Sequence, residues 1–238
     1  MHRRCIGALH ARDAPRRFVG RRSIDVGHRA TRLTPAKHPL DSNGIPAADS
    51  LAVPHPDSDS SVDTLWTIGH STRSWGDFLA LLTHWRIAAI VDVRRFPGSR
   101  RYPWFASEAM AEQLAASSIE YHWLPQLGGR RRAQPGSPNG AWRSAAFQGY
   151  ADHMTSDAFA DGLSQALAVA ARRRTALMCA EALWWGCHRR LIADLLTHRG
   201  VEVCHILDIG KVQPHVMHPD ARPAGADLVY PPAQAGLF

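Results

Sequence analysis

"TALMCAEALWWGCHRRLIADLLTHRGVEVCHIL", residues 175–207, decides the fold class. Residues 175–181 form an apolar run that is typical of a buried strand, and residues 187–200 have helical periodicity. Gly200 suits the C-terminal end of that helix, and a second apolar strand follows at 201–207. A strand, a helix and a strand in this order predict two parallel strands joined by a helical crossover.

The same alternation extends over most of the chain. Buried strands are predicted at 64–70, 88–94 and 121–127, and helices at 74–86, 108–117 and 156–173. Ser74 followed by Asp77 resembles a capping box, and Ser107 is expected to cap the second helix. Five strands and four helices together predict an α/β protein with a three-layer, Rossmann-like fold around a mainly parallel five-stranded sheet.

Three segments lack such a period. Residues 128–142 predict a long loop, and residues 211–238 an irregular tail in which 227–230 is expected to form a short edge strand. Residues 1–62 join an Arg-rich start to a stretch rich in Pro, Ser and Asp. They predict a disordered basic arm and linker, or residues added by an upstream start codon, ahead of an α/β domain at 63–238.

Composition limits the class of protein without selecting a function. Of the 238 residues, 45% are apolar, so a sizeable core is expected. The formal net charge is +7, and residues 1–62 hold ten basic and six acidic residues, which leaves about +3 for the remainder. That charge is compatible with nucleic acid or phosphorylated ligands and requires neither. No run approaches the ~18 apolar residues of a membrane span. Four cysteines without a secretory signal indicate a reducing, cytoplasmic location.

Polar residues follow the predicted strands at the edge where parallel sheets bind ligands. They are His70, Ser71, Asp92, Arg94, residues 127–132, Cys179 and Glu181. Strand ends at a surface are often polar, but this gathering at one edge favours a site. Glu181 ends an apolar run, so its carboxylate needs a partner, and an arginine of residues 91–101 is the expected one. The pair would be a structural ion pair, or Glu181 would serve as a general base.

The start of the last predicted helix suits negative charge. Cys187, His188 and Arg189 lie where free N–H groups and the helix dipole favour an anion. The same surroundings favour a thiolate on Cys187. His70 or His188 is expected to transfer protons. Cys179 lies within an apolar strand, where a buried thiol often has only a structural role.

Arginines are concentrated in the loops that follow the second and third strands. They are Arg94, Arg95, Arg100, Arg101 and residues 130–132. Planar guanidinium groups match phosphate oxygens, and nearby aromatic side chains could stack on a base. The candidates for an anion clamp are Arg94, Arg100, Arg130 and Arg189. A solvated basic surface is the alternative interpretation.

Metal and cofactor motifs are not evident. Residues 179–188 and 204–205 contain the ligand types of zinc, but Cys-x7-Cys-His is not a zinc-finger spacing and no CxxC pair occurs. GxGxxG, Walker A and GxSxG motifs are missing as well. We therefore expect no metal and no cofactor.

Several segments together resemble the DUF488 family, a domain of unknown function. They are "TIGHSTRSWGDFLALL" (67–82), "IVDVRRFPGSRR" (90–101), "IEYHWLPQLGGRRR" (119–132), "GYADHM" (149–154) and "ALMCAEALWWGCHRRLIADLLTHRGVEVCHI" (176–206). The resemblance covers residues 64–238, and Cys-Ala-Glu followed by Cys-His-Arg is the signature. It implies a three-layer α/β fold in a cytoplasmic protein and no established reaction. Rhodanese-like domains are a weaker similarity, because "ALWWG" (182–186) separates Glu181 from Cys187 where those domains have a short persulfide loop.

Three functions are compatible with these features. The first is an enzyme or ligand-binding domain for an anionic small molecule that bears phosphate, such as a nucleotide, with Asp92, Ser71 and Cys179 supporting the site. The second is a nucleic-acid-binding protein of DNA processing or repair. The third is thiol-dependent, rhodanese-like chemistry at Cys187.

Overall fold

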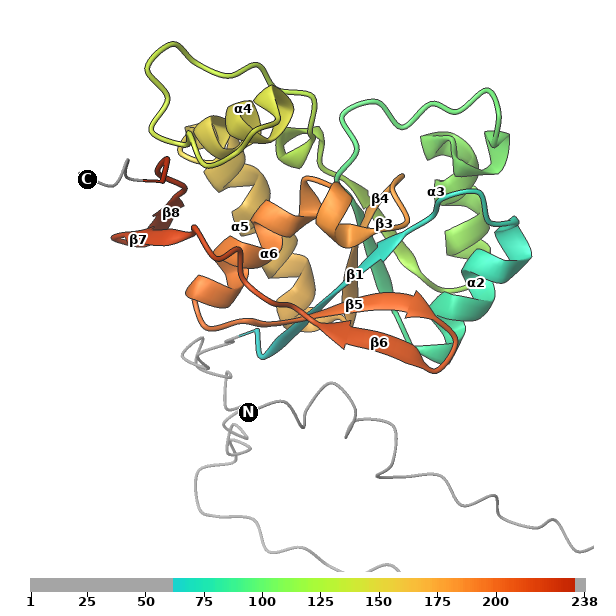
Figure 1. Cartoon of the computed structure of the whole chain (residues 1–238). Helices are drawn as coiled ribbons and strands as arrows, with labels where there is room; N and C mark the ends of the chain where they lie inside the picture. Colours follow the sequence, from blue (N-terminus) through green and yellow to red (C-terminus); the bar gives the residue numbers. More distant parts are fainter. Residues whose placement is uncertain (1–61, 234–238) are drawn as a thin grey trace, which may run out of the picture. The chain divides into compact units, whose positions relative to one another are not determined.

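The computed structural model describes residues 62–233. The predicted disordered arm, apart from Val62, lies outside the described residues. Within them, a sheet of six strands has the order β3-β2-β4-β1-β5-β6 (Figure 1). The strands are β1 (Thr64–Gly69), β2 (Ala89–Asp92), β3 (Glu120–Trp123), β4 (Thr175–Cys179), β5 (Glu202–Asp208) and β6 (Lys211–Pro214). Neighbours from β3 to β5 are parallel, and β6 is antiparallel to β5. The predicted α/β class and mainly parallel sheet are confirmed, with β6 as a sixth strand.

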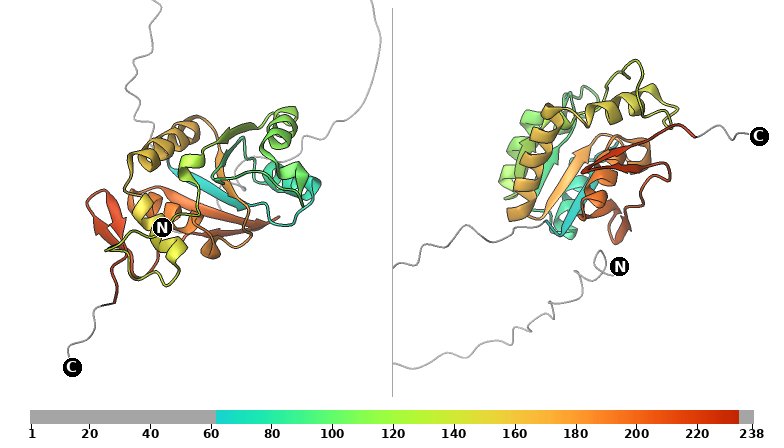
Figure 2. Two further views of the ribbon diagram at one scale, coloured as in Figure 1. Left: turned by 90° about the horizontal axis from the view of Figure 1, so that it is seen from above. Right: turned by 90° about the vertical axis from the view of Figure 1, so that its left-hand side faces the viewer.

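Helices cover both faces of this sheet. They are α2 (Trp75–His84), α3 (Ser107–Ala116), α4 (Ala145–His153), α5 (Asp157–Arg172) and α6 (Arg189–His198). Alternate strand residues point to opposite faces: Leu65 and Leu177 pack with α5 and α6, whereas Trp66 and Met178 pack with α2 and α3. Seen from above, the sheet lies between α5 on one side and α2 and α3 on the other (Figure 2, left). The three predicted layers are therefore present.

The sequence predicts three helix-end signals, and the structure confirms two of them. Ser74 Oγ accepts a hydrogen bond from the Asp77 amide at 3.1 Å, as the capping-box pattern predicts. Gly200 follows α6 with φ of 87°, a conformation that favours glycine. The predicted cap at Ser107 is wrong, because Ser107 is the first residue of α3 and Ala106 holds the cap position without a side-chain hydrogen bond.

Other boundaries differ from the prediction for physical reasons. The third strand stops at Trp123, since Pro125 lacks an N–H for the ladder and begins a short 3-10 helix. Helix α4 lies in a segment to which the sequence assigned no element. Its Gly149 weakens the helical pattern but is needed there, because a Cβ on it would lie 2.3 Å from the Arg132 carbonyl carbon.

The tail after α6 is more ordered than expected. Besides β6, it forms β7 (Arg222–Ala224) and β8 (Asp227–Val229), which pair with each other in a separate two-stranded sheet. The expected edge strand at 227–230 is thus a strand, but not at the edge of the main sheet. Leu228 and Tyr230 of this tail are buried in the core cluster that includes α5 and α6.

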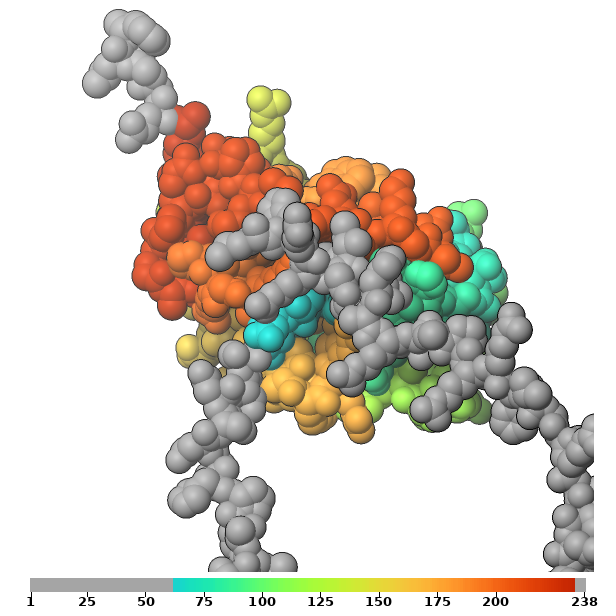
Figure 3. Space-filling view, turned by 90° about the horizontal axis from the view of Figure 1, so that it is seen from below, coloured from blue at the N-terminus to red at the C-terminus, as the bar shows by residue number. Residues whose placement is uncertain are grey.

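The connections leave a crevice at the carboxyl end of β4. From β1 and β2 the chain continues to α2 and α3 on one face, whereas from β4 it continues to α6 on the other. Neighbouring strands whose connections leave on opposite faces mark the ligand-binding point of an open α/β sheet. At the opposite, amino end of the strands, the start of β1 (cyan) lies beside the end of α5, as Figure 3 shows. The crevice at β4 is thus the first place to look for a site.

Candidate functional site

A cavity of about 410 Å³ occupies this crevice. Its wall comes from the loops after β2, β3 and β4 and from the start of α4 and α6. The lining residues are Arg94, Arg95, Phe96, Gly129, Arg130, Ser144, Ala146, Phe147, Cys179, Ala180, Glu181, Gly186, Cys187 and His188. A second cavity of about 640 Å³ shares part of this wall and extends to His70, Ser71 and Arg101. The predicted carboxyl-edge location therefore coincides with a real concave surface.

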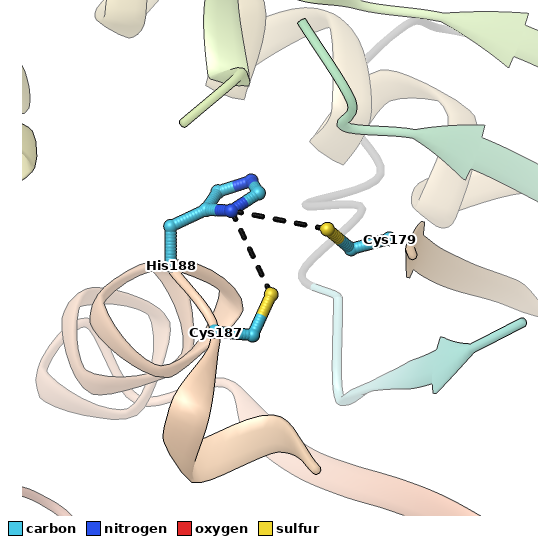
Figure 4. A group of neighbouring side chains, drawn as sticks. All are labelled: Cys179, Cys187 and His188. Atoms are coloured by element: carbon cyan, nitrogen blue, oxygen red, sulfur yellow. Dashed lines mark hydrogen bonds between the residues drawn. The ribbon is translucent and has the colours of Figure 1, made fainter. Parts of the chain in front are cut away.

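Cys179, Cys187 and His188 meet at the floor of the first cavity (Figure 4). Cys179 ends β4, and the 3-10 turn Trp184–Gly186 brings the chain back so that Cys187 and His188 precede α6. The His188 Nδ1 atom lies 3.6 Å from Cys187 Sγ and 3.9 Å from Cys179 Sγ. The three ligand atoms all lie within 4.8 Å of one another. Thiolates and imidazole are the ligands that zinc prefers, so this group could hold such an ion.

The orientation of the His188 ring is fixed by the backbone. Its Nε2 atom lies 3.0 Å from the Val93 carbonyl oxygen. A carbonyl oxygen can only accept, so Nε2 carries the hydrogen and donates it. In the neutral ring Nδ1 then has a free lone pair, and this atom faces the two sulfur atoms.

Arg189 lies behind Cys187 and is only 1% exposed. Its Nε donates to Cys187 Sγ at 3.4 Å, its Nη1 to Thr67 Oγ1 at 3.4 Å, and its Nη2 to the Glu181 carbonyl oxygen. No carboxylate within residues 62–233 forms an ion pair with it. A buried cation requires nearby negative charge, and the Cys187 sulfur is the ionisable group that it contacts.

The two thiols differ in acidity. A hydrogen bond with Cys187, and next burial, raises the pKa of Cys179. Burial also opposes ionisation of Cys187, but the hydrogen bond from Cys179 and the charges of His188 and Arg189 outweigh it and lower its pKa. Within this pair, Cys187 is therefore the more acidic thiol.

Asp92, Arg94 and His70 form a buried network in the wall of the site. Arg94 donates through Nε and Nη2 to the Asp92 carboxylate, which also accepts from Tyr121 Oη at 2.7 Å. Arg94 Nη1 contacts His70 Nε2 at 3.3 Å, and His70 Nδ1 donates to the Ser71 carbonyl oxygen. Burial, and next the charge of Arg94, lowers the pKa of His70 to about 4. The charge of Arg94 is neutralised by Asp92, and both ring nitrogens of His70 already have partners.

The remaining predicted residues are spread around the two cavities. Arg130 lines both, Ser71 lines the second, and Arg100 is exposed and lines neither. Glu181 is exposed and lines both cavities. Its expected ion pair with an arginine of residues 91–101 is not found between described residues, because Asp92 takes Arg94 and the chain turns Glu181 toward solvent. Arg189 does not line the cavities, so its guanidinium acts on Cys187 instead.

A chain of buried polar groups behind Arg189 escaped the sequence analysis. Thr67 Oγ1 lies 2.7 Å from His205 Nδ1, His205 Nε2 lies 3.0 Å from His215 Nδ1, and His215 Nε2 lies 2.8 Å from Asp194 Oδ1. Burial, then the charges of His215 and Arg189, lowers the pKa of His205 to about 2. The sequence does carry a signal for it, because Thr67 and His205 are polar residues within otherwise apolar strands. This series of hydrogen bonds fixes the position of the Thr67 hydroxyl group, and through it that of the Arg189 guanidinium group.

Fold and site together define an open α/β protein with a cysteine–histidine cluster and several arginines at the carboxyl edge of its sheet. The sequence profile described as "Domain of unknown function DUF488" matches residues 74–196, and the chain belongs to this family. The match contains all three residues of the cluster. No curated protein and no solved structure gives a significant match. No helix of residues 62–233 is long and apolar enough to cross a membrane.

Proposed function

We propose that this protein is an enzyme that binds a small, phosphate-bearing anion in the first cavity. The observation that carries the proposal is the pair Arg95 and Arg130: both residues line the cavity, and neither forms an ion pair with an acidic residue among residues 62–233. Arg95 Nη1 donates to the Arg130 carbonyl oxygen at 3.1 Å, which links the two loops. Unpaired guanidinium groups at a concave surface attract oxyanions.

Arg95 and Arg130 differ from the neighbouring Arg94 in that no carboxylate of residues 62–233 neutralises their charge. Arg94 is 6% exposed and held by the Asp92 carboxylate, so its charge contributes little to an incoming anion. Arg95 and Arg130 are exposed and keep their charge available. Glu181 lines the same cavity and repels an anion, which restricts the phosphate to the side of the two arginines.

The cavity also suits an apolar part of a ligand. Phe96, which is 64% exposed, and Phe147 line it beside the arginines. A volume of about 410 Å³ lies within the range of small-molecule sites. A phosphorylated molecule with a flat or apolar portion, such as a mononucleotide, therefore fits better than a polymer. The cysteine–histidine cluster at the floor supports catalysis rather than binding alone.

A calorimetric screen tests the proposal with inorganic phosphate, a ribonucleoside monophosphate, a hexose phosphate and a short single-stranded oligonucleotide. We expect saturable binding of at least one phosphorylated small molecule. Arg95→Gln and Arg130→Gln should each weaken it roughly tenfold to hundredfold, since a hydrogen bond to a charged group is worth ~1.5–3 kcal/mol. Arg100→Gln is the matched control, because this exposed arginine lies in the same loop as Arg95 but lines neither cavity.

Two results would oppose this function. Binding of none of the small phosphates would remove it, and so would equal affinities for the parent and the Arg95 and Arg130 variants. Binding of the oligonucleotide alone, with a steep dependence on salt, would favour the nucleic-acid interpretation instead.

A further inference from the structure

We propose that Cys179, Cys187 and His188 bind a divalent ion of the zinc class and leave its fourth position open to the first cavity. The three donors come from two places in the fold: the end of β4 and the residues just before α6. Their spacing in the sequence, Cys-x7-Cys-His, is not that of a zinc finger, and for this reason the sequence argued against a metal. The fold, not the spacing, brings them together.

The distances fit tetrahedral coordination. With Zn–S of about 2.3 Å and Zn–N of about 2.0–2.1 Å, a sulfur and a nitrogen on one tetrahedral ion lie about 3.6 Å apart. His188 Nδ1 lies 3.6 Å from Cys187 Sγ and 3.9 Å from Cys179 Sγ. All three side chains point toward a common centre in Figure 4. The two sulfur atoms lie within 4.8 Å of each other, so all three donors can close around one ion.

The partners of two of the donors, His188 and Cys187, match those of known metal ligands. A metal-bound histidine usually donates its other ring N–H to a carbonyl or carboxylate, which fixes the tautomer. His188 does this through Nε2 and the Val93 carbonyl oxygen, at 3.0 Å. Arg189 Nε donates to Cys187 Sγ at 3.4 Å and thereby stabilises a thiolate ligand. Both partners orient the lone pairs that a metal needs.

An open fourth position distinguishes catalytic from structural zinc sites. All three donor residues line the first cavity. A divalent ion, two thiolates and the buried Arg189 guanidinium leave one net positive charge at the floor. A water-derived hydroxide or an anionic ligand at the fourth position balances it. The phosphate of the proposed ligand is therefore expected to reach the metal, and this last step rests on the proposed function.

Metal content provides the test. The full chain is produced in zinc-supplemented medium and its zinc is measured per polypeptide; the protein is then stripped with a chelator and loaded with Co²⁺ for visible spectroscopy. We expect one zinc per chain, and the strong d–d and thiolate-to-cobalt bands of a tetrahedral site. Cys179→Ser, Cys187→Ser and His188→Ala should lose this metal, whereas His198→Ala, at the far end of α6, should retain it. Circular dichroism establishes that each variant is folded.

The contrary results are equally specific. The proposal fails if the parent protein holds no more zinc than a Cys179→Ser/Cys187→Ser double variant. It also fails if Cys187 is alkylated at the same rate with zinc present as after chelation, because that is the behaviour of a free thiol. A cobalt spectrum that phosphate leaves unchanged, in protein that binds phosphate by calorimetry, rejects the open position. Arg95→Gln and Arg130→Gln should keep the metal, so a failure of phosphate binding leaves the metal site standing.

Discussion

Asp92→Asn is expected to lower the free energy of unfolding more than any other substitution of similar side-chain size in the wall of the site. Asp92 is 0% exposed and is the acidic partner of Arg94, which is 6% exposed. Burial alone lowers the pKa of Arg94, and the Asp92 carboxylate more than reverses that effect. Asn keeps the volume but leaves the guanidinium buried without a counter-charge.

The magnitude follows from the kind of pair that is broken. Removing one partner of a buried ion pair costs about 3–5 kcal/mol, whereas replacing both partners by apolar residues is often close to neutral. Asp92→Asn should therefore lower the free energy of unfolding by about 3–5 kcal/mol. Asp92→Leu combined with Arg94→Met should recover much of that loss. Tyr121→Phe removes a single hydrogen bond to the carboxylate and should cost only about 1–3 kcal/mol.

Urea unfolding followed by circular dichroism measures these changes. Glu120→Gln is the matched control, because Glu120 forms exposed ion pairs with Arg172 and Arg173 and its loss should change stability much less. A loss below ~1 kcal/mol for Asp92→Asn would refute the reasoning. So would a double variant that is less stable than the single one.

Three further predictions concern stability. Ser74→Ala removes the cap on α2 and should lower the free energy of unfolding, measured in urea, by ~1 kcal/mol. Ser107→Ala should change that free energy by less than ~0.5 kcal/mol, and equal effects of the two variants would contradict the assignment of the caps. Gly149→Ala should lower the melting temperature, since the new Cβ meets the Arg132 backbone at 2.3 Å, and an unchanged melting temperature would show that this contact relaxes freely. His205 has its pKa lowered to about 2 from an ordinary 6.5, so the unfolded chain binds a proton between these values and the folded chain does not. The free energy of unfolding should thus fall as pH drops below 6.5, by up to about 1.4 kcal/mol per pH unit, and His205→Gln should remove that part of the slope.

The pattern of apolar runs was sufficient for the sheet and for most helices. All five predicted strands are present. β1, β2 and β4 are the continuous buried runs that parallel strands inside a sheet require, whereas β3 lies at the sheet edge and is only partly buried. The pattern failed where tertiary contacts override local preference. Helix α4 contains Gly149 because another part of the backbone passes close to it, and β6 is short and polar because it pairs on one side only.

The site could be located from the sequence but not assembled. The carboxyl-edge rule and the start of the last helix pointed to Cys179, Cys187 and His188, and the structure brings all three to the wall of one cavity. It could not separate arginines that an acid neutralises, such as Arg94, from those that form no ion pair within residues 62–233, such as Arg95. That distinction depends on which acid each arginine meets, and such pairings join distant loops. The same holds for the three donors of the proposed metal site, which share no recognisable spacing.

The most direct test of the proposed function is to locate a phosphate analogue in crystals of the full chain. Tungstate is a tetrahedral oxyanion like phosphate, and anomalous diffraction from its metal atom marks its position. We predict a peak in the first cavity, within hydrogen-bond reach of Arg95 and Arg130 and on the side of His188. Anomalous peaks confined to exposed arginines elsewhere, such as Arg172 and Arg173, would contradict an anion site at the carboxyl edge of the sheet.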